Sequence, residues 1–82
     1  MASELESIRF QIAVQREIVL REQRKRNELF NRAEQIKGLE GRSQEYWKVR
    51  HEEVLQKDNV FAEEKKLRDL ERAEQECLYR KR

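Results

Sequence analysis

Apolar residues in the first half of the chain recur at alternating spacings of three and four positions. They are Leu5, Ile8, Ile12, Val19, Leu29, Ala33 and Ile36. This spacing puts them on the a and d positions of one heptad frame and predicts a helix that packs lengthwise against another helix. Three polar residues, Gln15, Glu22 and Arg26, occupy positions of the same frame. Polar side chains in such a seam weaken it and favour one register or one partner over others.

The second half carries two apolar stripes that are displaced from each other by one position. One stripe repeats every seven residues at Trp47, Val54 and Phe61, and the other contains Tyr46, Val49, Val60, Leu67, Leu70 and Cys77. The displacement indicates either a discontinuity in the coiled coil or a helix that is apolar toward more than one neighbour. Two helices alone cannot cover that much apolar surface. We therefore expect self-association or docking on a larger partner.

Both glycines of the chain lie close together between the two patterned halves, at Gly38 and Gly41. Gly38 directly follows Lys37, which is typical of a helix C-terminus. Ser43 is a suitable N-cap for a second helix, and Ser3 followed by Glu6 is typical of a capping box at the start of the first. We therefore predict a single coiled-coil module over residues 1–82, with helices over about 4–37 and 44–80 and a turn over about 38–43.

The two predicted helices are nearly equal in length, which favours an all-α antiparallel helical hairpin that associates into a multi-helix bundle. Such a hairpin would bring the basic residues of 21–26 near Glu52, Glu53 and Asp58. The alternative is one continuous helix of about 120 Å in a dimeric parallel coiled coil, in which each glycine costs about 1 kcal/mol. No internal repeat with a period of roughly 20–50 residues is evident, although the two halves are alike in character.

The composition supports long solvated helices, because 44% of the residues are charged, 37% are hydrophobic and none is proline. The net charge of +2 is too small to indicate a nucleic-acid partner. The single cysteine, Cys77, excludes an intrachain disulfide and fits a reducing compartment, so we expect a cytoplasmic or nuclear protein. No apolar run approaches the roughly 20 residues that a membrane span requires.

Candidate catalytic or metal-binding chemistry is sparse. His51 has Val54 and Leu55 at the spacings where a second ligand would share its helix face. Cys77 lies at a seam position and nothing in the sequence supplies a pocket around it, so we expect it to pack as a small hydrophobic residue. We therefore expect no enzymatic activity, no cofactor, no metal and no small-molecule substrate.

A local cluster of basic residues is the one feature that favours a polyanion or nucleic-acid partner. It consists of Arg21, Arg24, Lys25, Arg26 and Arg32. No aromatic residues are interleaved with it for base stacking. A solvated or ion-paired helix surface is therefore the simpler interpretation.

These observations predict a non-catalytic assembly module that binds its own copies or the helices of a larger complex through coiled-coil packing. Trp47 is its most distinctive residue, because tryptophan is over-represented where interface energy concentrates. The predicted interface consists of Leu5, Ile8, Ile12, Val19, Leu29, Ile36, Trp47, Val54, Phe61, Leu67 and Leu70. The alternatives are polyanion binding through the basic cluster, or a rigid spacer segment of a cytoskeletal rod.

Overall fold

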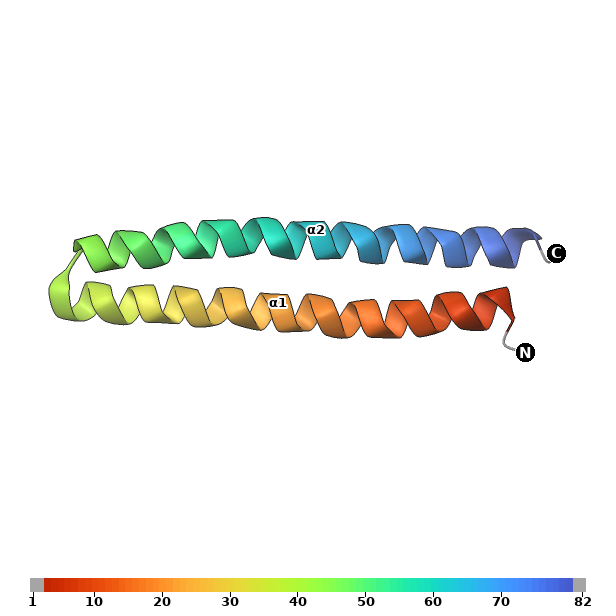
Figure 1. Cartoon of the computed structure of the whole chain (residues 1–82), viewed down its shortest axis with the longest axis horizontal. Helices are drawn as coiled ribbons and strands as arrows, with labels where there is room; N and C mark the ends of the chain where they lie inside the picture. Colours follow the sequence, from red (N-terminus) through yellow and green to blue (C-terminus); the bar gives the residue numbers. More distant parts are fainter. Residues whose placement is uncertain (1–2, 81–82) are drawn as a thin grey trace.

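Two long helices lie side by side and antiparallel in the computed structural model, which describes residues 3–80 (Figure 1). Helix α1 spans Glu4–Glu40 and helix α2 spans Gln44–Arg80. The molecule measures 60 × 17 × 14 Å. The prediction of an all-α helical hairpin is confirmed, and the alternative of a continuous helix about twice as long is wrong.

Both helices begin at the serines that the sequence indicates. The Ser3 hydroxyl accepts a hydrogen bond from the Glu6 amide at 3.1 Å, and the Ser43 hydroxyl accepts one from the Tyr46 amide at 3.3 Å. These bonds satisfy amides that have no partner within the first helical turn. Acidic residues in both first turns, Glu4, Glu6 and Glu45, add a favourable interaction with the helix dipole.

The turn differs from the prediction in its position. The expectation that Gly38 ends the first helix is wrong, because α1 continues through it to Glu40. Gly41 ends the helix instead, with a φ of 70° that residues bearing a side chain rarely adopt. Its amide still donates to the carbonyl of Lys37 at 2.9 Å, so Gly38 lies within the last hydrogen-bonded turn.

The seam between the helices uses the Tyr46 frame of α2. Its buried residues are Ile12, Gln15, Val19 and Ala33 from α1, and Tyr46, Val49, Glu53, Val60 and Cys77 from α2. The best-packed part lies next to the turn, where Ala33, Tyr46 and Val49 are joined by Leu29 and Ile36. The Trp47 stripe is thereby left outside the seam.

The charged residues of the basic stretch and of the facing part of α2 form ion pairs within their own helices. Within residues 3–80, Lys25 pairs with Glu22 of its own helix, and Glu53 pairs with Arg50 of its own helix. Side chains three residues apart lie on one helix face, so these local pairs form without a contribution from the other helix.

Candidate interaction surface

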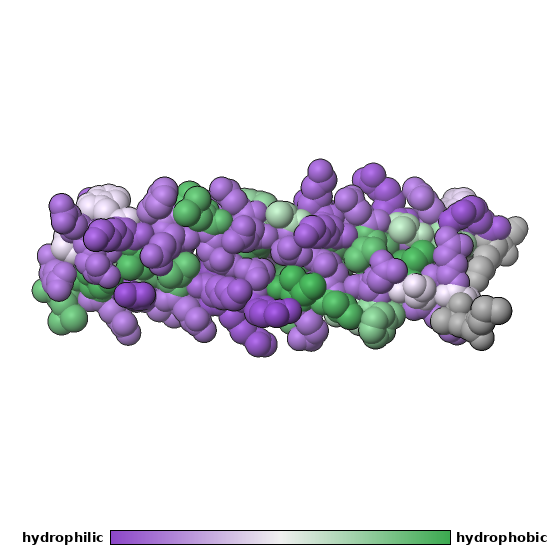
Figure 2. Space-filling model, in the orientation of Figure 1, coloured by the Kyte–Doolittle hydropathy of each residue, from purple (hydrophilic) through white to green (hydrophobic). Residues whose placement is uncertain are grey.

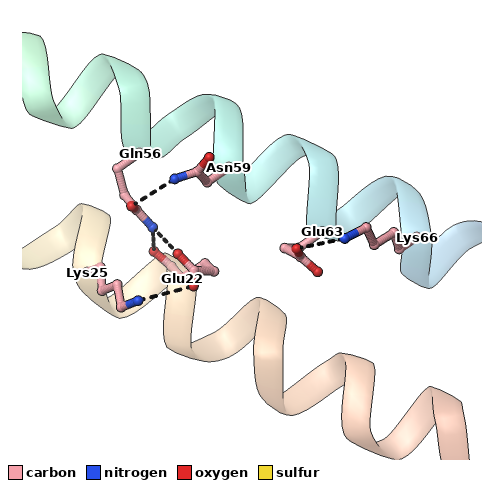
Figure 3. A network of polar contacts seen from close by, with 6 residues as sticks. All are labelled: Glu22, Lys25, Gln56, Asn59, Glu63 and Lys66. Carbon is pink, nitrogen blue, oxygen red and sulfur yellow. Dashed lines mark hydrogen bonds and ion pairs between the residues drawn. The ribbon is translucent and has the colours of Figure 1, made fainter.

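A polar layer lies near the middle of the hairpin seam. Gln15 donates to the backbone carbonyl of Glu63 at 2.9 Å and to its carboxylate at 2.6 Å. Gln56 makes the matching pair of bonds to the carbonyl and the carboxylate of Glu22. Figure 3 shows the Gln56 amide pointing from α2 toward both oxygens of Glu22 on α1. Each glutamine therefore joins its own helix to the backbone of the other.

The two glutamates of this layer are held in their charged form. The hydrogen bond from Gln56, followed by that from Lys25, lowers the pKa of Glu22 below its ordinary value of 4.5. The bond from Gln15, followed by that from Lys66, lowers the pKa of Glu63 in the same way. In both cases a hydrogen bond to the carboxylate stabilises the ionised state.

The polar layer has an internal pseudo-twofold symmetry. Gln15, Glu22 and Lys25 occupy positions 41 residues before Gln56, Glu63 and Lys66, which make the same contacts. The correspondence extends through the chain segments 14–25 and 55–66, which read VQREIVLREQRK and LQKDNVFAEEKK. The expectation that the sequence contains no such repeat is therefore wrong. The signal was missed because most matches replace one residue by a similar one.

The hairpin has two broad sides, one on each flank of the seam. On the first, the amide of Gln23 donates to Glu64 at 3.2 Å, and both residues follow a d position of their frame. On the second, Arg32 pairs with Glu45 at 3.5 Å, and both residues precede an a position. In a heptad these e and g positions flank the seam on opposite sides. We refer to the two surfaces as the Gln23 side and the Arg32 side.

Large apolar side chains are exposed together on the Gln23 side. Leu20 lies one turn before Gln23, and Phe61 lies one turn before Glu64, so both are on this side. Phe30 follows Gln23 by one heptad, and Val54 and Trp47 precede Phe61 by one and two heptads, so they share the same side. We call these side chains, which lie outside the seam, the second stripe. Its members are Leu20, Phe30, Trp47, Val54 and Phe61, and their exposed fractions are 44, 45, 56, 55 and 55%.

Apolar residues are more isolated on the Arg32 side. Val14, Leu39 and Leu55 are exposed there to 43, 88 and 53%, and charged residues such as Arg21, Glu28 and Lys48 lie among them in the heptad frame. Figure 2 shows one broad face of the molecule, on which hydrophilic side chains predominate and apolar atoms form separate patches. The two sides of the hairpin therefore differ in how much contiguous apolar surface they can offer a partner.

The structure divides the predicted interface into two groups. Eight residues occupy seam positions and are buried or half-buried: Leu5, Ile8, Ile12, Val19, Leu29, Ile36, Leu67 and Leu70. The other three, Trp47, Val54 and Phe61, lie outside the seam. Sequence analysis did not place Leu20 or Phe30 with these three. The 41-residue correspondence was the available signal for Leu20, because it matches that residue to Phe61.

The basic cluster does not form one continuous surface. Lys25 and Arg32 line a shallow hollow of about 350 Å³ together with Glu28, Leu29 and Gln56. Lys25 and Arg32 each pair with a glutamate. Arg21 shares the Arg32 side with these two, whereas Arg24 lies on the outer face of α1 and Arg26 is half-buried at the seam.

The two residues considered for chemistry occupy unremarkable places. Cys77 is a free thiol, exposed to only 2%, and packs in the seam as expected. His51 borders a hollow of about 440 Å³ with Gln44, Trp47 and Lys48. Within residues 3–80 no group of three or more His, Cys, Asp or Glu side chains is placed to hold a metal ion.

Comparison with known proteins adds no relative: no protein-family model matches the chain, and neither does any curated protein or solved structure. Between residues 3 and 80, neither helix has a segment long and apolar enough to cross a lipid bilayer. The surface of the hairpin is therefore the feature that bears on function.

Proposed function

We propose that the chain is a non-catalytic assembly module that binds helices of other proteins, or its own copies, by coiled-coil packing. The observation that carries this proposal is the second stripe, which exposes five large apolar side chains on one side of a hairpin. Contiguous exposed apolar surface of this kind marks interaction sites. The seam of the hairpin is already filled, so these side chains have no role in closing it.

The size of the stripe suits helix packing. Burying the exposed half of one such side chain contributes about 1 kcal/mol, since full burial contributes roughly 1.5–3 kcal/mol. Five side chains together contribute about 5 kcal/mol, which is near the lower end of the roughly 4–15 kcal/mol that association costs. The apolar contacts alone therefore support weak binding, and the flanking polar contacts decide which partner binds tightly.

The spacer alternative has little support. Glu4 and Arg80 form an ion pair at 3.4 Å, so the start of α1 and the end of α2 lie at the same end of the molecule (Figure 1). A segment whose first and last helical residues lie together cannot keep the structures attached to its two ends far apart. The polyanion alternative is also weaker, because Lys25 and Arg32 are already paired with acidic residues. The free Cys77 fits a reducing compartment, so we place the module in the cytoplasm or nucleus.

The test is whether the second stripe mediates association. Multi-angle light scattering over a wide concentration range reports binding between copies. Fluorescence emission of Trp47, the only tryptophan in the sequence, reports binding of synthetic amphipathic helices whose flanking charges are varied. We expect at least one of these two forms of association. Val54→Glu with Phe61→Glu should abolish it, whereas Leu55→Glu on the Arg32 side, at similar exposure, should not.

The proposal is overturned by either of two results. The first is a chain that has the mass of one copy at every concentration and binds none of the peptides. The second is association that the double substitution leaves unchanged, because the second stripe would then not be the surface involved.

A further inference from the structure

Two basic residues lie along the α2 part of the second stripe. Between Trp47 and Phe61, the polar residues at e and b positions on the Gln23 side are Arg50 and Lys57; between Leu20 and Phe30 they are Gln23 and Asn27. Arg50 is already paired with Glu53 of its own helix, and the carboxylate of Glu64, one turn beyond Phe61, accepts the hydrogen bond of Gln23. A partner that covers the stripe therefore meets Lys57 as the basic group at these positions between Trp47 and Phe61 that has no acidic partner in the described part of the hairpin.

Lys57 is available to a partner. Its ammonium group lies 5.9 Å from the centre of the Phe61 ring, and among residues 3–80 no carboxylate forms an ion pair with it. A lysine that lies over an aromatic face keeps its charge next to the apolar surface. Lys57 therefore marks the edge of the stripe with a positive charge that remains free to bind an acidic group.

Trp47 lies at the turn end of the stripe. Its ring packs edge-on against Tyr46 with the ring centroids 5.0 Å apart, and its exposed part gives a partner helix an aromatic contact. The hollow of about 440 Å³ beside it is also lined by Gln44, Lys48 and His51, so it lies on the outer face of α2 and not on the Gln23 side.

A second copy of the chain does not match this surface. In a symmetric dimer the same patch serves both copies. Stripe against stripe would then bring Arg50 and Lys57 of one copy near the same two residues of the other. Like charges placed together in an interface disfavour association. Stripe against the Arg32 side would use a different surface on each copy, so it would not close into a symmetric dimer.

We propose that the second stripe docks an amphipathic helix of another protein whose apolar face is flanked by acidic residues. This inference rests on the proposed function and specifies its partner. The helix would lie along the Gln23 side, parallel to the long axis, and would place a carboxylate near Lys57. Electrostatic complementarity of this kind selects partners and speeds their encounter.

The experiment uses two synthetic helical peptides with identical apolar faces. One has glutamates flanking the apolar face and the other has lysines, and Trp47 emission of the full chain is the readout for both. We expect the acidic peptide to bind about tenfold more tightly than the basic one in dilute buffer, with the difference shrinking as salt is added.

Variants with matched controls locate the docking surface. Lys57→Glu should weaken the acidic peptide about tenfold, while Arg72→Glu, an equal charge change at an exposed position beyond the end of the stripe, should leave its affinity unchanged. Val54→Ser with Phe61→Ser should also weaken it, and Leu55→Ser should not. Far-ultraviolet circular dichroism establishes that each variant keeps its helices.

The possible results separate the inference from the proposed function. If both peptides bind equally, or only the basic one binds, or Lys57→Glu has no effect, the acidic partner is overturned while helix binding by the stripe stands. Self-association through the stripe, without peptide binding, has the same consequence. If neither peptide binds and the chain does not self-associate, both proposals fail.

Discussion

Gln15 and Gln56 replace apolar residues at seam positions and thereby weaken the hydrophobic seam. In return, they fix the alignment of the two helices along the seam. In the observed hairpin Gln56 binds Glu22, and sliding α2 by seven residues in either direction would bring Val49 or Glu63 to that place. Either residue would leave the Glu22 carboxylate without a donor from the other helix. The polar layer therefore selects one register of two helices whose heptads would otherwise permit several.

The polar layer also makes stability depend on pH. The pKa values of Glu22 and Glu63 are lower in the folded hairpin than in the unfolded chain. Their contribution to stability is therefore fully present above the unfolded-state pKa of about 4.5, and it is lost as pH falls through their lower folded-state pKa values. We expect urea unfolding midpoints to decrease over this acidic range. Gln15→Leu with Gln56→Leu should reduce the decrease, since it removes the largest cause of both shifts.

A control for this titration is Glu17→Gln, which changes an exposed carboxylate outside the polar layer. It should leave the acid dependence close to that of the wild-type chain. An identical dependence in the wild-type chain and in the double-leucine variant would show that the two glutamine–glutamate contacts do not set it.

At the scale of the helix, the two glycines have opposite roles. Gly38 lies inside α1, and nothing lies within 4 Å of the place where a Cβ would be added. Alanine at this position should stabilise the hairpin by about 1 kcal/mol because it removes the conformational cost of glycine in a helix. Gly41 has a φ of 70°, so Gly41→Ala should destabilise it by about 1 kcal/mol.

Thermal unfolding of the two alanine variants measures this contrast. The predicted result is a higher midpoint for Gly38→Ala and a lower one for Gly41→Ala. The opposite order would mean that the helix ends at Gly38 in solution, as the sequence alone suggested.

The sequence was sufficient to predict two helices, their capping serines and their antiparallel arrangement, because these follow from heptad spacing and local capping chemistry. It could not show which glycine reverses the chain. A glycine in a helix costs only about 1 kcal/mol, and packing of Ile36 and Ala33 on α2 is enough to keep Gly38 helical. Nor could it choose between the Tyr46 and Trp47 stripes, since both repeat with the heptad. The choice depends on contacts between positions far apart in the chain, such as Gln15 with Glu63.

At the scale of the molecule, the hairpin is a thin rod of 60 × 17 × 14 Å with little interior. Chains of this size have small cores and commonly gain stability from further packing. A third helix laid along the Gln23 side would cover the second stripe and turn the hairpin into a three-helix bundle. This side carries five of the large exposed apolar residues, on both helices.

Small-angle X-ray scattering of the chain, alone and with the acidic amphipathic peptide, tests this account most directly. The account predicts a maximum dimension close to 60 Å for the free chain. Adding the peptide should increase the mass by one peptide and enlarge the cross-section without lengthening the particle. A free chain of about 120 Å would contradict the hairpin. A complex that grows in length, or no complex at all, would contradict docking along the Gln23 side.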